Sequence, residues 1–189
     1  MSIDKILDAV LAEGLATFSM PSLGDRLGVA YSGLYRYVSD RDDLLVLALG
    51  RVAREACWPS HDLPWREQLA GIGETLWTIC GTYPGYDAAA VSTRNISPGF
   101  VEMLTPYVDS MCGQGLDIVD ATAAIDFVRT LVLNSSIDAT RLDSIASMPD
   151  APEHSIRAYA DPEKWEGRSW YRRQLETYLD GLAHRVGPT

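Results

Sequence analysis

The residues best able to make specific recognition contacts lie together between positions 31 and 41. The stretch reads Tyr-Ser-Gly-Leu-Tyr-Arg-Tyr-Val-Ser-Asp-Arg, in which aromatic rings, hydroxyl groups and two arginines surround only two aliphatic residues. Guanidinium groups donate to guanine edges or to phosphates, and a glycine lets a backbone approach closely. Such residues suit nucleic-acid recognition, provided that a local element presents them outward.

Two short helices are predicted around this stretch, one over residues 19–27 and the other over residues 29–38. Ser19 can cap the first helix, and Pro21 falls in its first turn, where a missing N–H costs little. Gly28 then interrupts the pattern and permits a tight turn. The pair predicts a helix-turn-helix, whose second helix can lie in the major groove of DNA.

The apolar spacing indicates which side chains of this pair face inward. Leu23 and Leu27 on the first helix, with Leu34 and Val38 on the second, form one apolar face. A helix that only packs a core is the alternative interpretation, which the small and polar residues beside Leu34 disfavour. We expect base reading by Tyr31, Ser32, Gly33, Arg36 and Tyr37, and phosphate contacts by Arg26, Tyr35 and Arg41.

Helical spacing continues along almost the whole chain and predicts an all-α fold. An N-terminal three-helix helix-turn-helix domain is expected over residues 1–50, and a larger helical domain over residues 51–189. Further helices are predicted over residues 3–11, from residues 39–40 onward, and over 65–82, 98–112, 118–139 and 169–186, with a loop at 143–167 that holds a short helix at 154–159.

Composition limits the class of protein. The chain has 189 residues, of which 47% are hydrophobic and 22% charged, which supports a folded core rather than disorder. No run of 18 apolar residues occurs and the first eleven residues lack the basic flank of a signal peptide, so we expect a cytoplasmic protein that does not contact the membrane. The net charge of −10 argues against a basic coat but leaves room for a small, locally basic surface.

Catalytic and metal-binding patterns do not occur in the sequence. Cys57, Cys80 and Cys112 form no CxxC pair, and we interpret them as buried reduced thiols. The three histidines have no metal-binding spacing, and neither a Gly-rich phosphate loop nor a GxSxG motif is present. We therefore predict no enzyme activity, no catalytic residue, no metal and no cofactor.

The first 50 residues resemble the DNA-binding domain of TetR-family transcriptional regulators. The matching segments are Gly14 and Leu15, Ser19 and Met20, Leu23, residues 26–29, residues 34–38 and residues 41–45. The remainder resembles the family only in its helical layout. The resemblance implies a homodimeric repressor that binds a palindromic double-stranded DNA operator and leaves it when a small-molecule effector binds the C-terminal domain.

Three features depart from the family pattern. Pro21 stands where an Arg or Lys often contacts DNA, and Ala30 stands where a Ser or Thr often caps the reading helix. Residues 1–50 carry four basic side chains against seven acidic ones, a net charge of −3. We therefore expect weak non-specific DNA binding with a shallow salt dependence. These departures also keep open an alternative: a ligand-binding or protein-interaction module that has lost DNA affinity.

The family resemblance also implies an effector pocket and a dimer interface in the C-terminal domain. Aromatic and sulfur side chains could wall a pocket, and Thr93, Arg94 and Asn95 could add polar groups, although the same residue types also build ordinary cores. In the family two helices of each subunit form the dimer interface, which here would be residues 118–137 and the last helix. The candidate pocket residues are Trp77, Tyr83, Tyr86, Phe100, Met103, Tyr107, Phe127 and Arg129.

Overall fold

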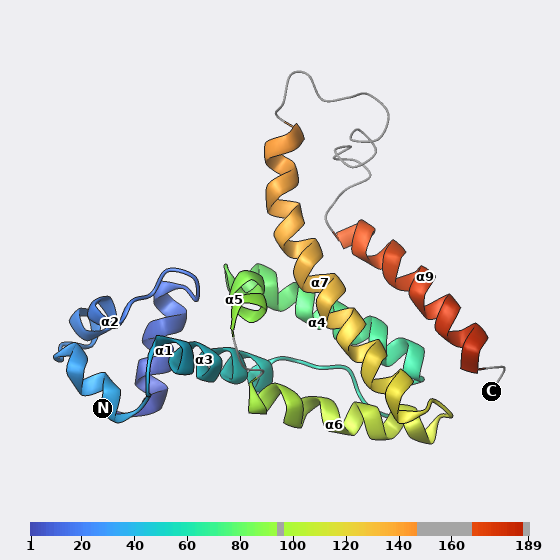
Figure 1. The fold of residues 1–189 in the computed structure, drawn as a ribbon, viewed down its shortest axis with the longest axis horizontal. Coiled ribbons are helices and arrows are strands. Elements are labelled where there is room, and N and C mark those ends of the chain that lie inside the picture. The colour runs from blue at the N-terminus through green and yellow to red at the C-terminus, as the bar shows by residue number, and fades with distance from the viewer. Residues whose placement is uncertain (94–96, 147–167, 187–189) are drawn as a thin grey trace. The chain divides into compact units, whose positions relative to one another are not determined.

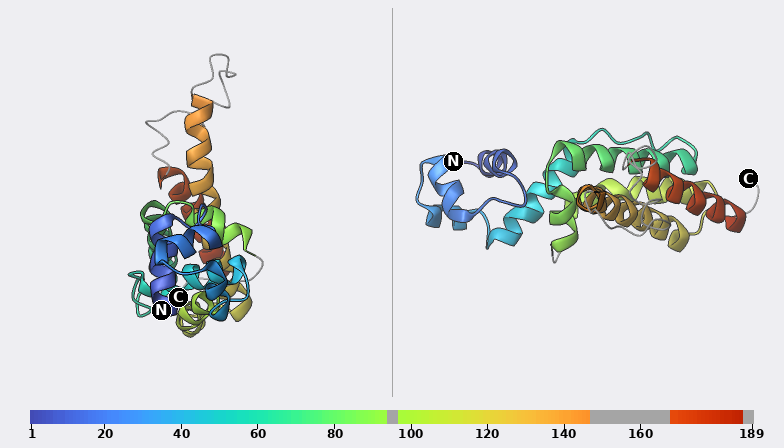
Figure 2. Two further views of the ribbon diagram at one scale, coloured as in Figure 1. Left: turned by 90° about the vertical axis from the view of Figure 1, so that its left-hand side faces the viewer. Right: turned by 90° about the horizontal axis from the view of Figure 1, so that it is seen from above.

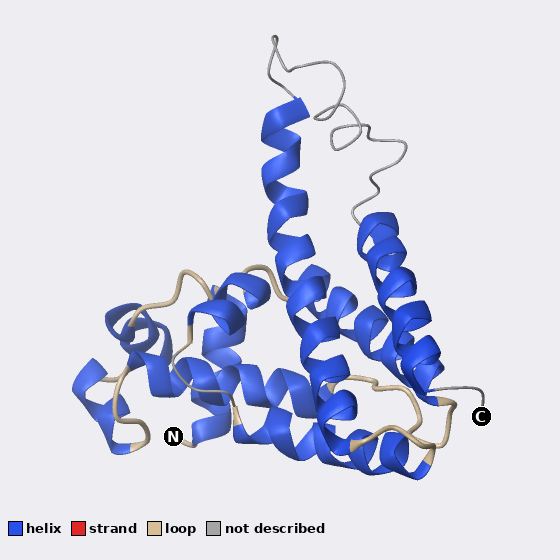
Figure 3. Cartoon of the chain, turned by 45° about the vertical axis from the view of Figure 1, so that its right-hand side comes forward, coloured by secondary structure: helices blue, strands red, loops and turns tan. Residues whose placement is uncertain are grey.

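The computed structural model describes residues 1–93, 97–146 and 168–186, and the regular elements in these ranges are all helical (Figure 1, Figure 3). The predicted all-α fold is confirmed. No helix within the described ranges is long and apolar enough to cross a membrane. In chain order the elements are α1 (Ile3–Glu13), α2 (Met20–Leu27), the 3₁₀ helix η1 (Tyr31–Arg36), α3 (Arg41–Glu55), α4 (Trp65–Thr82), α5 (Tyr86–Ser92), α6 (Pro98–Gly113), α7 (Ile118–Ala146) and α9 (Arg168–Val186).

The chain divides into two compact units. Unit 1 comprises Met1–Cys57 and Thr78–Thr105, and unit 2 comprises Trp58–Trp77 and Pro106–Thr189. The helix-turn-helix residues therefore lie in unit 1. In unit 2, α7 packs against α9 (Figure 2).

The beginning of α2 is fixed by its own side chains and by the end of α1. Ser19 and Ser22 form a capping box, in which Ser19 Oγ accepts from the Ser22 N–H at 3.2 Å and Ser22 Oγ accepts from the Ser19 N–H at 3.1 Å. Ser22 Oγ also donates to the carboxylate of Glu13. The predicted cap at Ser19 is confirmed, and it joins α2 to α1.

The turn after α2 depends on two glycines. Gly28 adopts the left-handed conformation, with φ 66° and ψ 32°, and closes α2 through its N–H. A Cβ at Gly24 would lie 3.0 Å from both the Val29 carbonyl oxygen and the Tyr31 nitrogen, so a glycine is needed for the turn to approach α2 closely. This close approach positions η1 against α2.

The second element of the motif is shorter and more tightly wound than the helix predicted over residues 29–38. It is a 3₁₀ helix of six residues whose N-cap, Ala30, provides no side-chain hydrogen bond. Tight 3₁₀ winding is common in short helices. Gly33 has a low helix propensity and the N-terminus lacks a side-chain cap, so neither feature stabilises a longer helix here. The element is held instead by Leu34, which is completely buried in the core of unit 1.

Elsewhere most predicted helices occur, with two differences. The short helix α5 was not predicted, because its seven residues contain three alanines and show no clear apolar period. Helix α7 continues past residue 139 to Ala146. The short helix predicted over residues 154–159 lies outside the described residues.

Unit 2 contains two polar networks built on side chains of α4. The Gln68 side chain is fully buried, and its Nε2 donates to the carbonyls of His61 at 2.9 Å and Leu63 at 2.6 Å, which holds the segment before α4. Glu74 on α4 accepts hydrogen bonds from Arg168, Tyr171 and Arg172 of α9. Because these donors lie more than 90 residues from Glu74 along the chain, they connect α9 to α4.

Candidate nucleic-acid interface

The winding of η1 determines which of its side chains face outward. A 3₁₀ helix repeats every three residues, so positions 31, 34 and 37 share one side. Leu34 on that side is buried and Tyr37 is half-buried, with its hydroxyl donating to the Met1 carbonyl at 2.6 Å. The other two sides carry Ser32 with Tyr35, and Gly33 with Arg36, so these four residues form the outer surface of the element.

Arg36 is the cation of this surface that is free to bind a partner. Its side chain is exposed and makes no hydrogen bond or ion pair with any described residue. Arg26 lies near Glu13, with 3.9 Å between Nε and Oε2. Arg41 is half-buried, because its Nε donates to the Phe18 carbonyl at 3.1 Å and its guanidinium lies 4.3 Å from the centre of the Phe18 ring.

Two tyrosine rings extend this surface. Tyr31 is 53% exposed and Tyr35 is 48% exposed, although both rings could have been buried in a core. The rings meet edge to face, with 6.5 Å between their centroids. The eight residues predicted to contact DNA thus lie on or beside η1, with Arg26 on α2 and Arg41 at the start of α3.

The four predicted pocket residues of unit 2 are engaged in different contacts. Trp77 stacks on Tyr171 with a centroid distance of 5.0 Å, and the Tyr107 hydroxyl donates to the Pro59 carbonyl. Burial raises the pKa of Tyr107. Arg129 pairs with Asp126 one helical turn away, at 2.8 Å. The fourth residue, Phe127, stacks on a tyrosine of α9 and lines a groove.

The other four predicted pocket residues lie in unit 1. Tyr86 and Phe100 are buried, whereas Tyr83 and Met103 are half-buried. Tyr86 is the first residue of α5, and Phe100 and Met103 lie in the first turns of α6. Of the polar residues predicted beside them, Arg94 and Asn95 lie outside the described residues.

A groove of about 340 Å³ lies between α7 and α9 in unit 2. Its α7 side repeats at three- and four-residue steps, which places one continuous stripe along the helix. The sequence contains this spacing. It was not recognised because the residues of the stripe are smaller and more polar than those of the apolar face that includes Val128. The lining residues are Phe127, Thr130, Leu131, Asn134, Ser135, Asp138, Trp170 and Gln174.

Comparison with known proteins identifies the class. No family model matches the chain. An HTH-type transcriptional regulator from Saccharopolyspora erythraea is 30% identical over 202 residues, which cover 97% of this chain and 85% of that protein. The HTH-type transcriptional repressor DrrR1 of Streptomyces coeruleorubidus is 25% identical over 142 residues, which cover 72% of this chain and 53% of that protein.

Solved structures show the same fold. The TetR family protein ActR of Streptomyces coelicolor, in complex with (S)-DNPA, superposes with a TM-score of 0.79 at 20% identity, and 99% of each chain is covered. BioQ with its double-stranded DNA operator superposes with a TM-score of 0.71 at 19% identity, covering 97% of this chain and 99% of that one.

The helix-turn-helix of unit 1, the curated relatives and the shared fold agree. The chain is an HTH-type transcriptional regulator with the fold of TetR family proteins, the family that its first 50 residues resemble. It is a DNA-binding regulator rather than an enzyme.

Proposed function

We propose that this protein is a homodimeric cytoplasmic repressor that binds a palindromic operator and releases it when a small molecule binds. DrrR1 is a repressor, ActR is solved with a bound small molecule and BioQ with its operator, and each supports one part of this proposal. Residues 1–50 would bind DNA, and residues 51–189 would bind the effector and form the dimer.

The observation that carries the DNA-binding proposal is the outer surface of η1. Arg36 is exposed and has no partner among the described residues, and it stands beside exposed hydroxyl and aromatic groups. An exposed guanidinium without such a partner can donate two hydrogen bonds to a guanine. The proposed DNA-contacting set is Arg26, Tyr31, Ser32, Gly33, Tyr35, Arg36, Tyr37 and Arg41.

We place the dimer face on the stripe that lines the groove between α7 and α9. Within the two helices that the resemblance implies for this role, Val128 and Val132 on α7 and Leu179 on α9 are buried within the chain itself. They are therefore unavailable to a second copy. The adjacent stripe, which includes Leu131 and Trp170, remains for that contact.

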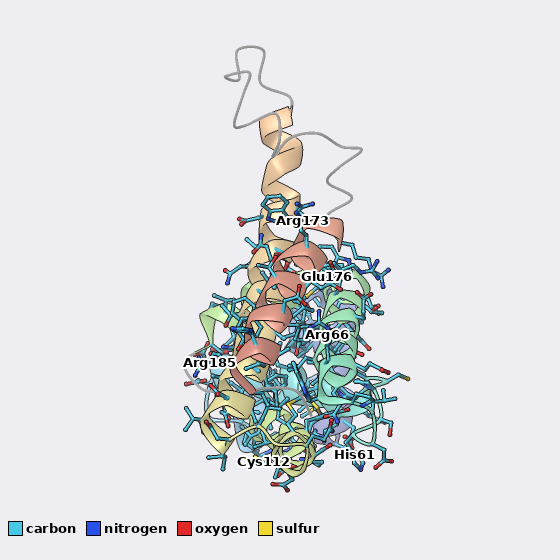
Figure 4. All side chains as sticks on the ribbon, turned by 90° about the vertical axis from the view of Figure 1, so that its right-hand side faces the viewer. His61, Arg66, Cys112, Arg173, Glu176 and Arg185 are labelled. Atoms are coloured by element: carbon cyan, nitrogen blue, oxygen red, sulfur yellow. The ribbon has the colours of Figure 1, made fainter. Side chains whose placement is uncertain are left out.

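The test of operator binding compares two arginines. Arg36→Ala should weaken binding to the regulator's own upstream DNA by about 1–3 kcal/mol, because a base contact is lost. Arg173→Ala is the matched control, since Arg173 is an exposed arginine of α9 far along the chain from η1 (Figure 4). Fluorescence anisotropy against upstream and scrambled duplexes measures both variants. Equal affinities for Arg36→Ala and the wild type would contradict the assignment.

A further inference from the structure

The surface around η1 offers little positive charge to DNA phosphates. Two of the four basic side chains in residues 1–50 are already engaged within the chain, Arg26 near Glu13 and Arg41 at Phe18. Arg36 and Lys5 are exposed and have no side-chain partner among the described residues. Phosphate contacts alone therefore give this surface little affinity.

Two tyrosine rings are exposed on the surface around η1. Tyr31 and Tyr35 are each about half exposed, and their rings are held edge to face. Neither hydroxyl forms a hydrogen bond with another described residue, and both side chains are exposed. The two rings are therefore accessible to a partner. In the major groove the one apolar group on a base edge is the C5-methyl of thymine.

We infer that the Tyr31–Tyr35 pair packs against thymine C5-methyl groups in each operator half-site, while Arg36 donates to an adjacent guanine. This inference rests on the proposed operator binding. It moves Tyr35 from the phosphate contact expected from the sequence to base reading, because its exposed ring lies beside that of Tyr31. Specificity then comes from methyl burial and one arginine rather than from a basic surface.

The charge count sets the expected salt dependence. Of the two free cations in each subunit, Arg36 is assigned to a guanine and Lys5 remains for phosphates. Two copies of Lys5 in a dimer neutralise about two phosphates, which gives a slope of log K against log salt near −2. Lys5→Ala removes both of these contacts and should make the slope shallower by about 2. A wild-type slope of about −8 or steeper would overturn the inference, because it would require phosphate contacts that these two cations cannot supply.

The operator chemistry is tested on DNA chosen by the protein. The full chain first selects duplexes from a random-sequence double-stranded library. If no sequence is enriched, the proposed operator binding fails as well as this inference. If a sequence is enriched, it is synthesised in two forms, one with thymidine and one with deoxyuridine at every thymidine position, which removes only the C5-methyl groups.

Anisotropy titrations of the two duplexes then isolate the methyl groups. Burial of one methyl contributes about 0.8 kcal/mol, which is about fourfold in affinity and about fifteenfold over two half-sites. The wild type and Lys5→Ala should both show this preference for the thymidine duplex. The double variant Tyr31→Ala/Tyr35→Ala should bind the thymidine duplex more weakly and show no preference, with circular dichroism to establish that it is folded.

The outcomes separate this inference from the proposed function. Specific binding with equal affinity for the two duplexes would overturn the methyl contacts and leave the operator proposal intact. A preference that persists in the double tyrosine variant would also overturn the inference, because the methyl groups would then be read by other residues. A guanine-to-7-deazaguanine exchange, which removes N7, should weaken wild-type binding about tenfold and leave Arg36→Ala unaffected.

Discussion

At the scale of single residues, Glu74 has the most strongly altered environment of any carboxylate in the described part of unit 2. The hydrogen bond from Arg172 is the main reason that the pKa of Glu74 is lowered to about 2, and bonds from Tyr171 and Arg168 add to it. Burial, together with the bond to Glu74, raises the pKa of Tyr171. A carboxylate with a lowered pKa stabilises the folded state at pH values above its ordinary pKa of 4.5.

We therefore expect Glu74→Gln to lower the free energy of unfolding at pH 7 by about 1–2 kcal/mol, because the side chain is partly exposed and solvent screens its ion pairs. As the pH falls from about 4.5 toward 2, the wild type loses this stabilisation and the difference between the two proteins shrinks. Urea unfolding at pH 7, 5 and 3.5 measures the difference. Glu67→Gln, an exposed glutamate of the same helix, is the control and should stay within about 0.5 kcal/mol of the wild type. A constant difference at all three pH values would contradict this account.

Single-residue environments were the least predictable feature of the sequence. The exposed positions of Tyr35 and Arg36 followed from the apolar spacing around Leu34. The internal contacts of Arg41 did not, because the Phe18 carbonyl lies 23 residues away and no local pattern relates the two. Long-range ion pairs such as that between Glu74 and Arg172 depend on tertiary packing and leave no spacing signal.

At the scale of elements, the uncapped start of η1 is a point of weakness. Ala30 has φ −60° and ψ 129°, the extended backbone that an N-cap serine adopts, yet its side chain has no acceptor. Ala30→Ser should raise the free energy of unfolding by about 1 kcal/mol, because its hydroxyl can accept an unbonded N–H of the first turn. Urea unfolding of the full chain tests this.

Ala12→Ser provides a control with the opposite sign. Ala12 is exposed in the last turn of α1, where serine has a lower helix propensity than alanine and no N–H to cap. This variant should lose about 0.5 kcal/mol. If Ala30→Ser also lost stability, the backbone at residue 30 would not be acting as an N-cap.

Elements with strong local signals were predictable from the sequence. Ser19, Pro21 and Gly28 mark the two ends of α2, and the bounds predicted for α4 agree with Trp65–Thr82. Helix α5 has no comparable signal, because it begins after Gly85 with no side-chain cap. The 3₁₀ winding of η1 was likewise not predictable, because it depends on the missing cap and on the close approach at Gly24 rather than on the spacing of apolar residues.

At the scale of the whole molecule, operator binding by a dimer requires that one face of the chain remain available to a second copy. Helix α7 buries Val128 and Val132 in unit 2 and leaves the stripe containing Thr130 and Leu131 beside the groove. A two-fold axis places the same stripe of both subunits in contact. A charge introduced there therefore enters the interface twice, close to its own copy.

Thr130→Arg should convert the dimer to a monomer and weaken operator binding, because two guanidinium groups would be buried near each other without partners. The side chain of Thr130 is exposed in the single chain, so the substitution leaves the core of unit 2 intact. Thr122→Arg is matched to it, since Thr122 is also an exposed threonine of α7 but does not line the groove. Sedimentation velocity should show a dimer for the wild type and Thr122→Arg, and a monomer for Thr130→Arg. A dimeric Thr130→Arg with wild-type operator affinity would place the interface elsewhere, because an interface built on this stripe cannot accept two unpaired charges at Thr130.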